Sequence, residues 1–315
     1  MIEIVVASTF AGGVIDGVEL EPHGTVRVNG WSLANELPVC TLICGDIVKQ
    51  PDATYRRARP DVVDVHGSAN FFAGFAVEFR HARSDPFAIA FGDRSIAVDA
   101  RHASVLTQHQ PEYVELLDGE AVLHRDNIYG VGAPIDWVHP DVLALALQLA
   151  SPVLDFGCGN GAMVRALRAH GVEAFGLELD SKRIRESLQG DVAPYITLYD
   201  GTFPAPFVDG QFESVVSSEV IEHIPNFGTA IEEIARICRS RFAITVPDMS
   251  CIPIGHRHGF VPWHLMESTH VNFFNHHSVA KLLRGHFTNL TFYQLAGGRL
   301  NGTFVPGSLG VIADR

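Results

Sequence analysis

Short apolar runs separated by turn-forming pairs fill the first 130 residues of the chain. The runs are rich in β-branched and aromatic residues and read IEIVVAS, TVRVNGWSL, VCTLICGDIV, NFFAGFAVEF, FAIAF, SIAVDA and EYVELL. The pairs that predict turns between them are Asp16-Gly17, Asn29-Gly30, Gly92-Asp93 and Asp118-Gly119. No helical period of useful length interrupts them. The pattern predicts an all-β antiparallel sandwich domain over residues 1–130.

The pattern changes after the stretch YGVGAP at 129–134, which marks a junction. The run HPDVLALALQLA predicts a helix with Pro140 in its first turn. Strands are then predicted over 152–156, 173–178, 195–199, 213–217, 241–246, 289–295 and 304–312, and helices over 161–170, 181–189, 219–239 with a break at Pro225, and 277–285. This alternation predicts an α/β domain over 131–315, with helices on both faces of a parallel sheet and a C-terminal antiparallel hairpin at its edge.

Charge and cysteine content exclude several classes of function. The chain has 315 residues and a formal net charge of −13, which disfavours both a large nucleic-acid surface and an anionic membrane surface. Its 5 cysteines are odd in number and scattered, so a disulfide framework is not expected. The apolar N-terminus lacks a basic leader, and no apolar run reaches the ~18 residues of a membrane span. A cytoplasmic protein is therefore expected.

Three glycines follow the first predicted strand of the second domain, in VLDFGCGNGAMVRAL at 153–167. Such a loop before a helix lets backbone N–H groups approach a ligand closely. The spacing Gly157-x-Gly159-x-Gly161 is not the dinucleotide pattern, and the Gly-Lys-Ser/Thr of a phosphate-binding P-loop is absent. Glu178 ends the next strand, where a carboxylate can accept hydrogen bonds from both hydroxyls of a ribose. Asp200 ends the third strand, where it can reach an adenine amino group.

The segments VLDFGCGNG, GLELD, LYDGTFPAPFVDGQFESVV and SSEVIEHI occur in this order. In sequence and spacing, residues 137–315 resemble class I S-adenosylmethionine-dependent methyltransferases. The resemblance implies a Rossmann-like sheet with a reversed edge hairpin, and S-adenosylmethionine as cofactor. The residues expected to bind it are Tyr129, Asp155, Gly157, Cys158, Gly159, Gly161, Glu178, Leu179, Asp200, Gly201 and Ser218.

The stretch SEVIEHI at 218–224 carries the candidate catalytic residues, Glu222 and His223. If it opens a helix, Glu219, Glu222 and His223 share one face. The stretch resembles the Glu-x-x-Glu-His site of the metal-dependent branch of the superfamily, which implies a divalent ion, Mg²⁺ first, with His270 as a fourth ligand. Two alternatives remain open: Glu219 serves only the helix dipole, or His223 acts without metal as a base or shapes the pocket.

The substrate is less defined by the residues. Seven of the 16 histidines lie between 256 and 286, in a region expected to fold over the mouth of the pocket. The pairs Gly30-Trp31 and Gly74-Phe75 and the run Arg59-Pro60-Asp61-Val62 loosely resemble β-sandwich modules that accompany surface-polysaccharide enzymes. The leading expectation is an O-methyltransferase acting on a sugar or glycan hydroxyl, with an oligomeric or glycan-assembly partner at the sandwich. The alternatives are a methyltransferase of quinone-like, natural-product or amine molecules, and an idle cofactor-binding subunit with a glycan-binding module.

Overall fold

A computed structural model of the whole chain describes residues 2–4, 8–10, 12–20, 25–37, 39–67, 70–80, 87–92, 94–98, 104–105, 136–188, 190–258, 262–267, 269–300 and 303–315. The chain divides into two compact units, Met1–His109 with Asn301–Thr303 and Gln110–Leu300 with Phe304–Arg315. The predicted junction at 129–134, the domain boundary at residue 130 and the run EYVELL lie outside the described residues. That boundary therefore stays a prediction.

The first unit contains two antiparallel sheets. The larger has the strand order β11-β1-β3-β4-β8-β7, with β2 paired to β3, and the smaller has the order β10-β9-β5-β6. Their strands are β1 (Ile2–Ile4), β2 (Ser8–Phe10), β3 (Gly13–Leu20), β4 (Thr25–Ser32), β5 (Cys40–Cys44), β6 (Ile47–Lys49), β7 (Ala53–Arg57), β8 (Gly74–Arg80), β9 (Phe87–Phe91), β10 (Arg94–Val98) and β11 (Ser104–Val105).

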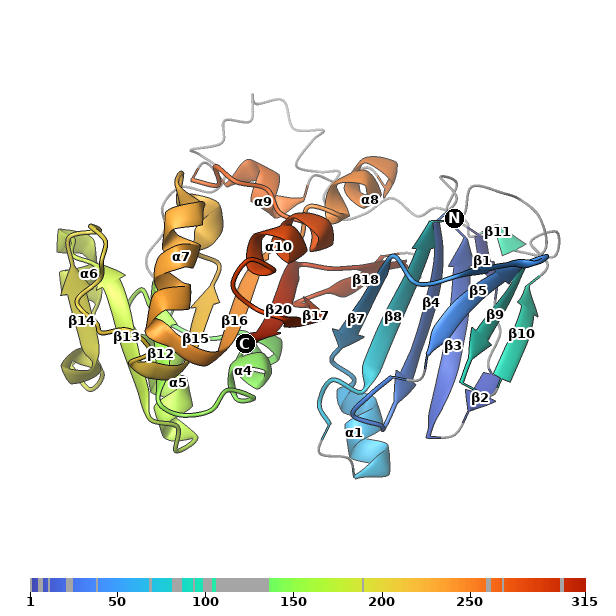
Figure 1. Cartoon of the computed structure of the whole chain (residues 1–315), viewed down its shortest axis with the longest axis horizontal. Helices are drawn as coiled ribbons and strands as arrows, with labels where there is room; N and C mark the ends of the chain where they lie inside the picture. Colours follow the sequence, from blue (N-terminus) through green and yellow to red (C-terminus); the bar gives the residue numbers. More distant parts are fainter. Residues whose placement is uncertain are drawn as a thin grey trace. The chain divides into compact units, whose positions relative to one another are not determined.

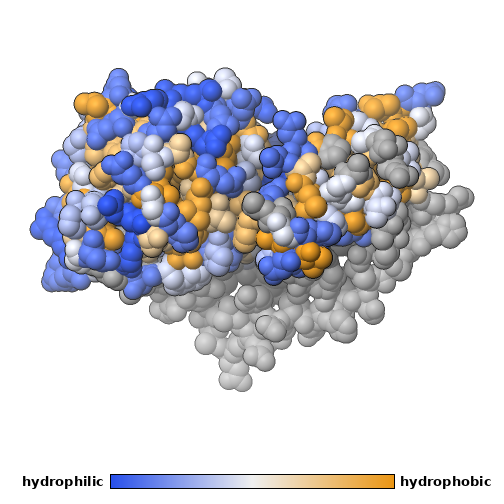
Figure 2. Space-filling model, turned by 90° about the horizontal axis from the view of Figure 1, so that it is seen from below, coloured by the Kyte–Doolittle hydropathy of each residue, from blue (hydrophilic) through white to orange (hydrophobic). Residues whose placement is uncertain are grey.

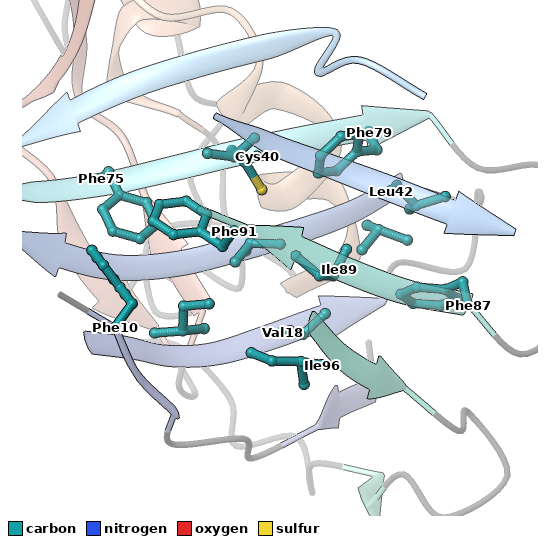
Figure 3. Packing of buried hydrophobic residues seen from close by; sticks show 14 residues of the cluster. Phe10, Val18, Cys40, Leu42, Phe75, Phe79, Phe87, Ile89, Phe91 and Ile96 are labelled. Atoms are coloured by element: carbon teal, nitrogen blue, oxygen red, sulfur yellow. The ribbon is translucent and has the colours of Figure 1, made fainter. Parts of the chain in front are cut away.

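A single apolar core joins the two sheets, as Figure 3 shows. Alternate residues of β4, β5, β8 and β9 point into it, as the period of two along a strand requires. The rings of Phe10, Phe75 and Phe91 lie 4.7–6.4 Å apart at its centre. On the opposite face of β4, Arg27 donates to Glu78 and Asn29 donates to Glu19. Strand alternation thus gives one apolar and one polar face, and the predicted β-sandwich is confirmed.

Three local predictions for this unit are wrong. Asp16-Gly17 is not a turn but lies inside β3, where the register with β4 shifts between Ile15 and Gly17. Asn29-Gly30 lies inside β4, where a Cβ on Gly30 would stand 2.3 Å from the carbonyl oxygen of Val14. The helix α1 (Pro60–His66) was not expected. At the two glycine pairs, the pairing of β3 with β4 outweighs the local turn signal.

The second unit is built on one mixed sheet with the order β17-β20-β16-β15-β12-β13-β14 (Figure 1). Its strands are β12 (Val153–Phe156), β13 (Ala174–Leu179), β14 (Ile196–Tyr199), β15 (Phe212–Ser218), β16 (Cys238–Pro247), β17 (Asn289–Leu295) and β20 (Ser308–Asp314). The strands from β14 to β16 are parallel, whereas β20 runs antiparallel to both β16 and β17. The chain therefore has the predicted Rossmann-like sheet with a reversed edge.

Helices flank this sheet, and most of its parallel strands are separated by a helix in the chain (Figure 1). They are α4 (Pro140–Ala146), α5 (Ala162–Ala169), α6 (Lys182–Ser187), α7 (Phe227–Ile237), α8 (Cys251–His258), α9 (Trp263–Met266) and α10 (His276–Leu283). Pro140 lies in the first turn of α4, as expected. The helices α8 and α9 and the strand β18 (Gly298–Leu300) were not predicted. The strand predicted over 304–312 is divided in the structure into β19 (Thr303–Val305) and β20.

The surface of the described residues is largely hydrophilic on the face that Figure 2 shows, with smaller apolar areas between. None of the helices among the described residues combines the length and apolar character that crossing a lipid bilayer requires.

Candidate active site

The glycine loop after β12 has a backbone that side chains would disturb. Gly157, Gly159 and Gly161 have φ values of 81°, 56° and 88°, in the left-handed region that favours glycine. A Cβ on Gly157 would lie 2.6 Å from Val220, and one on Gly161 would lie 2.6 Å from Ile196. Gly161 caps α5, so the N–H groups at the start of that helix follow directly on the loop. The loop is therefore shaped as a cradle for a polar ligand.

Four other predicted cofactor residues lie at the same edge of the sheet. Asp155 and Glu178 stand near the carboxyl ends of β12 and β13, Asp200 follows β14, and Ser218 ends β15. Strand order reverses at β12, which has β13 on one side and β15 on the other. This reversal is where open α/β sheets bind ligands. The structure thus brings the predicted residues to one edge.

Glu178 and Leu179, at the end of β13, contact the loops that follow β12 and β14. Glu178 accepts hydrogen bonds through Oε2 from the Gly159 amide and through Oε1 from the Leu179 amide, both at 2.7 Å. The Leu179 side chain is 50% exposed, and a Cβ on Gly201 would lie 2.8 Å from it. An exposed aliphatic side chain beside a glycine offers an apolar surface at the place expected for the adenine.

Cys158, Ser218 and Tyr129 are the remaining residues predicted to bind the cofactor. The Cys158 thiol is buried against Gly176, and burial, with Asp155 second, raises its pKa far above its ordinary value. It therefore supplies no thiolate. The Ser218 hydroxyl lies 2.9 Å from the hydroxyl of Thr245. Tyr129 lies outside the described residues.

Asp155 is fully buried at this edge. Burial, and secondly the charge of Glu178, raise the pKa of Asp155 from 3.8 to about 8. Between these two values the folded protein binds more protons at this carboxyl than the unfolded chain does. The contribution of Asp155 to folding stability is therefore lost as the pH rises from about 4 to about 8.

We expect Asp155→Asn to remove this pH dependence. Relative to the wild type without cofactor, the variant should gain stability as the pH rises from 5 to 8, by up to about 1 kcal/mol per pH unit. Urea unfolding of both proteins at each pH measures the difference. Parallel pH profiles would contradict the neutral, buried state of this carboxyl.

A second group of titratable side chains lies beyond β15. Glu222, His223 and His270 each offer one ligand atom, and these atoms all lie within 4.8 Å of one another. The Glu222 side chain is fully buried, and neither of its oxygens makes a hydrogen bond. Burial, and secondly the charge of Glu219, raise the pKa of Glu222 well above its ordinary value. A buried carboxyl of this kind is stabilised by a cation or a proton.

Backbone carbonyl groups fix the tautomer of both histidines. Nδ1 of His223 lies 3.2 Å from the carbonyl oxygen of Thr269, and Nδ1 of His270 lies 3.0 Å from that of His264. Because a carbonyl oxygen only accepts, each Nδ1 carries the proton of the neutral ring. Each Nε2 then keeps a lone pair for a metal ion or a proton. Metal-binding histidines typically have this second partner.

The prediction that Glu219 opens a helix and shares a face with Glu222 and His223 is wrong. Glu219 has φ 54°, and the 3-10 helix η3 (Ile221–His223) begins after it. Its buried carboxyl lies near Thr245 and Ser308, and burial raises its pKa to about 7. Glu219 is outside the three-residue group, because its left-handed backbone turns the chain between the two glutamates.

The histidine-rich region contributes unequally to the site. His256, His277 and His286 are exposed, whereas His264 and His270 are buried. The His264 ring lies 5.6 Å from His270 and 5.3 Å from Phe273. Burial, and secondly His270, lower the pKa of His264 to about 4, so it is neutral. The positions of the Thr269 and His264 carbonyls had no signal in the sequence, since backbone groups carry none.

Comparison with known proteins agrees with this arrangement. Residues 135–290 match the family described as "Methyltransferase domain". The chain is 27% identical over 113 residues to O-methyltransferase resE of Aspergillus sclerotiorum and 26% identical over 115 residues to 27-O-demethylrifamycin SV methyltransferase of Amycolatopsis mediterranei. These matches span 33% and 35% of this chain and 42% of each relative.

Among solved structures, a SAM dependent methyltransferase from Archaeoglobus fulgidus is 15% identical, with a TM-score of 0.43, covering 55% of this chain and 91% of the other. The family match covers β12 to β16 and therefore every described residue proposed for the cofactor. From the matched residues, the glycine loop and the sheet order, we conclude that residues 135–290 are a methyltransferase domain of the class I S-adenosylmethionine-dependent family.

Proposed function

We propose that this chain is an S-adenosylmethionine-dependent O-methyltransferase that acts on a hydroxyl group of a small molecule. The observation that carries the proposal is the group of Glu222, His223 and His270 beyond β15, next to the cofactor edge. A hydroxyl group is a poor nucleophile until its proton is removed, whereas an amine needs less help. The names of the two relatives, O-methyltransferase resE and 27-O-demethylrifamycin SV methyltransferase, indicate that those proteins methylate an oxygen atom.

The cofactor residues would act by alignment. The N–H groups of the glycine loop and α5 suit a carboxylate, and Glu178 suits the ribose hydroxyls. Leu179 and Gly201 form the apolar surface for the adenine. Methyl transfer from a sulfonium is an in-line displacement, so the main task of these residues is to hold the methyl group toward the acceptor.

The group beyond β15 fits a divalent ion. It combines a buried carboxyl that makes no hydrogen bond with two histidines whose Nδ1 atoms lie against backbone carbonyl oxygens. Three protein ligands leave further positions for a substrate. Two imidazoles and one carboxylate favour Zn²⁺ or Fe²⁺ over the Mg²⁺ expected from the sequence, because Mg²⁺ prefers oxygen ligands. When bound, such an ion would lower the pKa of an acceptor hydroxyl.

His223 can also remove a proton without metal. Its side chain is 37% exposed, whereas Glu222 beside it is fully buried, at 3.8 Å between Nε2 and Oε1. With Nδ1 donating to Thr269, Nε2 is the basic atom. The proton of the acceptor hydroxyl would then move to Nε2 as the methyl group is transferred.

An acceptor panel tests the proposal. The full chain is incubated with S-adenosylmethionine, divalent ions and, separately, phenols, quinols, hydroxylated natural products, amines, simple sugars and glycans. Release of S-adenosylhomocysteine and the NMR signal of the new methyl group identify the product. A small-molecule methyl ether supports the proposal. Methylation of sugars or glycans alone would favour the glycan alternative, which has no support from the relatives. Cofactor binding without turnover would favour the idle subunit.

A substitution in the loop tests the cofactor site. Gly157→Ala should weaken S-adenosylmethionine binding about tenfold or more, because the added Cβ collides with Val220 at φ 81° and shifts the loop. Calorimetry on the full chain measures the affinity. Gly171→Ala is the matched control, since Gly171 has φ 79° but no atom within 4 Å of the added Cβ. Equal S-adenosylmethionine affinities in the two variants would show that the loop does not take part in cofactor binding.

A further inference from the structure

The three residues of the group beyond β15 come from two separate segments. Glu222 and His223 lie on η3, and His270 lies 47 positions after His223, before α10. The hydrogen bonds that η3 makes with its own neighbours are few: the His223 amide donates to Val220 at 3.0 Å and the Ile224 amide donates to Ile221 at 3.3 Å. A 3-10 turn this short has little stability of its own. Its position therefore depends on contacts from outside.

Val271 and Asn272 supply outside hydrogen bonds to η3, which also packs against α7 and β16. Both backbone amides donate to the carbonyl oxygen of Glu222, at 2.9 and 3.0 Å. The side-chain amide of Asn272 donates through Nδ2 to the carbonyl oxygens of Ile221 at 3.0 Å and Ile224 at 2.7 Å. A third carbonyl oxygen, that of Glu222, lies 3.5 Å from the same nitrogen. Since all three partners are acceptors, only a donor suits this position.

We propose that Asn272 is a positioning residue, which holds the turn carrying Glu222 and His223 against the segment carrying His270. Its side-chain amide donates to carbonyl oxygens at both ends of η3. The spacing between the two segments is therefore fixed by a side chain that contacts none of the three titratable groups. Its contribution to turnover rests on the proposed function, whereas its effect on the geometry does not.

The chain offers a matched control three residues later. Asn275 caps α10, and its side chain accepts from the Ser278 amide at 2.9 Å. Asn275→Ala therefore removes a hydrogen-bonded asparagine side chain from the same segment without touching η3. Loss of general stability should appear in both variants, whereas loss of the spacing between segments should appear only in Asn272→Ala.

The experiment measures Zn²⁺ binding by calorimetry and the histidine tautomers by long-range ¹H–¹⁵N NMR, on the full chain. In Asn272→Ala we expect Zn²⁺ affinity to fall about 10- to 100-fold, with S-adenosylmethionine affinity within about twofold of the wild type. The Nδ1–H tautomer signals of His223 and His270 should become mixed. Asn275→Ala should leave the Zn²⁺ affinity and the tautomer signals unchanged.

Unchanged Zn²⁺ affinity and tautomers in a folded Asn272→Ala would overturn the proposal, as would equal losses in Asn275→Ala. If Asn272→Ala does not fold, Asn272→Ser, which keeps one donor, should show the same changes to a smaller extent. If the wild type binds no Zn²⁺ and transfers no methyl group, the proposed function fails, and the tautomer signals alone decide on Asn272.

Discussion

Turnover is expected to fall sharply when divalent ions are removed, while S-adenosylmethionine stays bound. The ligand atoms of Glu222, His223 and His270 lie together, and Glu222 is a fully buried carboxyl without a hydrogen bond. The cofactor edge is formed by other residues, at the ends of β12, β13 and β14. Exhaustive chelation should therefore lower the rate about 100-fold or more, with cofactor affinity within about twofold. Adding back Zn²⁺, Fe²⁺, Mn²⁺ and Mg²⁺ separately identifies the ion.

Single substitutions connect that loss to Glu222 and His270, two of the three residues. Glu222→Ala and His270→Ala should each show the same loss of turnover, and added metal should not restore the activity of either variant. His277→Ala is the control, because His277 is exposed on α10. Glu219→Ala decides whether a fourth ligand is needed, since Glu219 lies outside the group in the structure. Full activity in chelator would reject the metal and leave His223 as the candidate base.

The parallel sheet and the cofactor edge could be predicted because their signals are local. The strands β12 and β13 are each followed within a few residues by a turn and a helix, and β14 is followed by the turn signal Asp200-Gly201, so Gly157, Glu178 and Asp200 could be placed at strand ends from sequence alone. Parallel strands then bring those ends to one edge without further information. The gathering of the candidate cofactor residues at this edge therefore follows from the topology of the sheet.

The rest depends on contacts that are distant in sequence. The amides of Val271 and Asn272 donate hydrogen bonds to η3, and the tautomers of His223 and His270 are set by the backbone of Thr269 and His264. The positive φ of Glu219, which separates it from Glu222, could not be expected from a residue type that rarely adopts it. The register shift at Asp16-Gly17 likewise looks like a turn until its partner strand is known.

Loss of the Glu178 carboxylate is expected to weaken cofactor binding about 10- to 100-fold, which corresponds to ~1.5–3 kcal/mol for hydrogen bonds to a charged group. Glu178 stands where the ribose hydroxyls are proposed to bind, and both of its oxygens already hold backbone amides of the site, those of Gly159 and Leu179. Glu178→Ala would thus remove a ligand contact and also loosen the glycine loop. Calorimetry with S-adenosylmethionine measures the affinity, and Glu178→Gln, which keeps one oxygen and the shape, should lose less.

The control for this substitution lies on the other end of the same strand. Glu173 is exposed just before β13, so Glu173→Ala changes the charge by the same amount away from the carboxyl edge. Its affinity should match that of the wild type. The pH dependence of turnover should keep its shape in Glu178→Ala, because the proton-accepting group lies beyond β15 rather than on β13. An affinity within about twofold of the wild type in Glu178→Ala, well below the energy of two such hydrogen bonds, would show that this carboxylate does not hold the ribose.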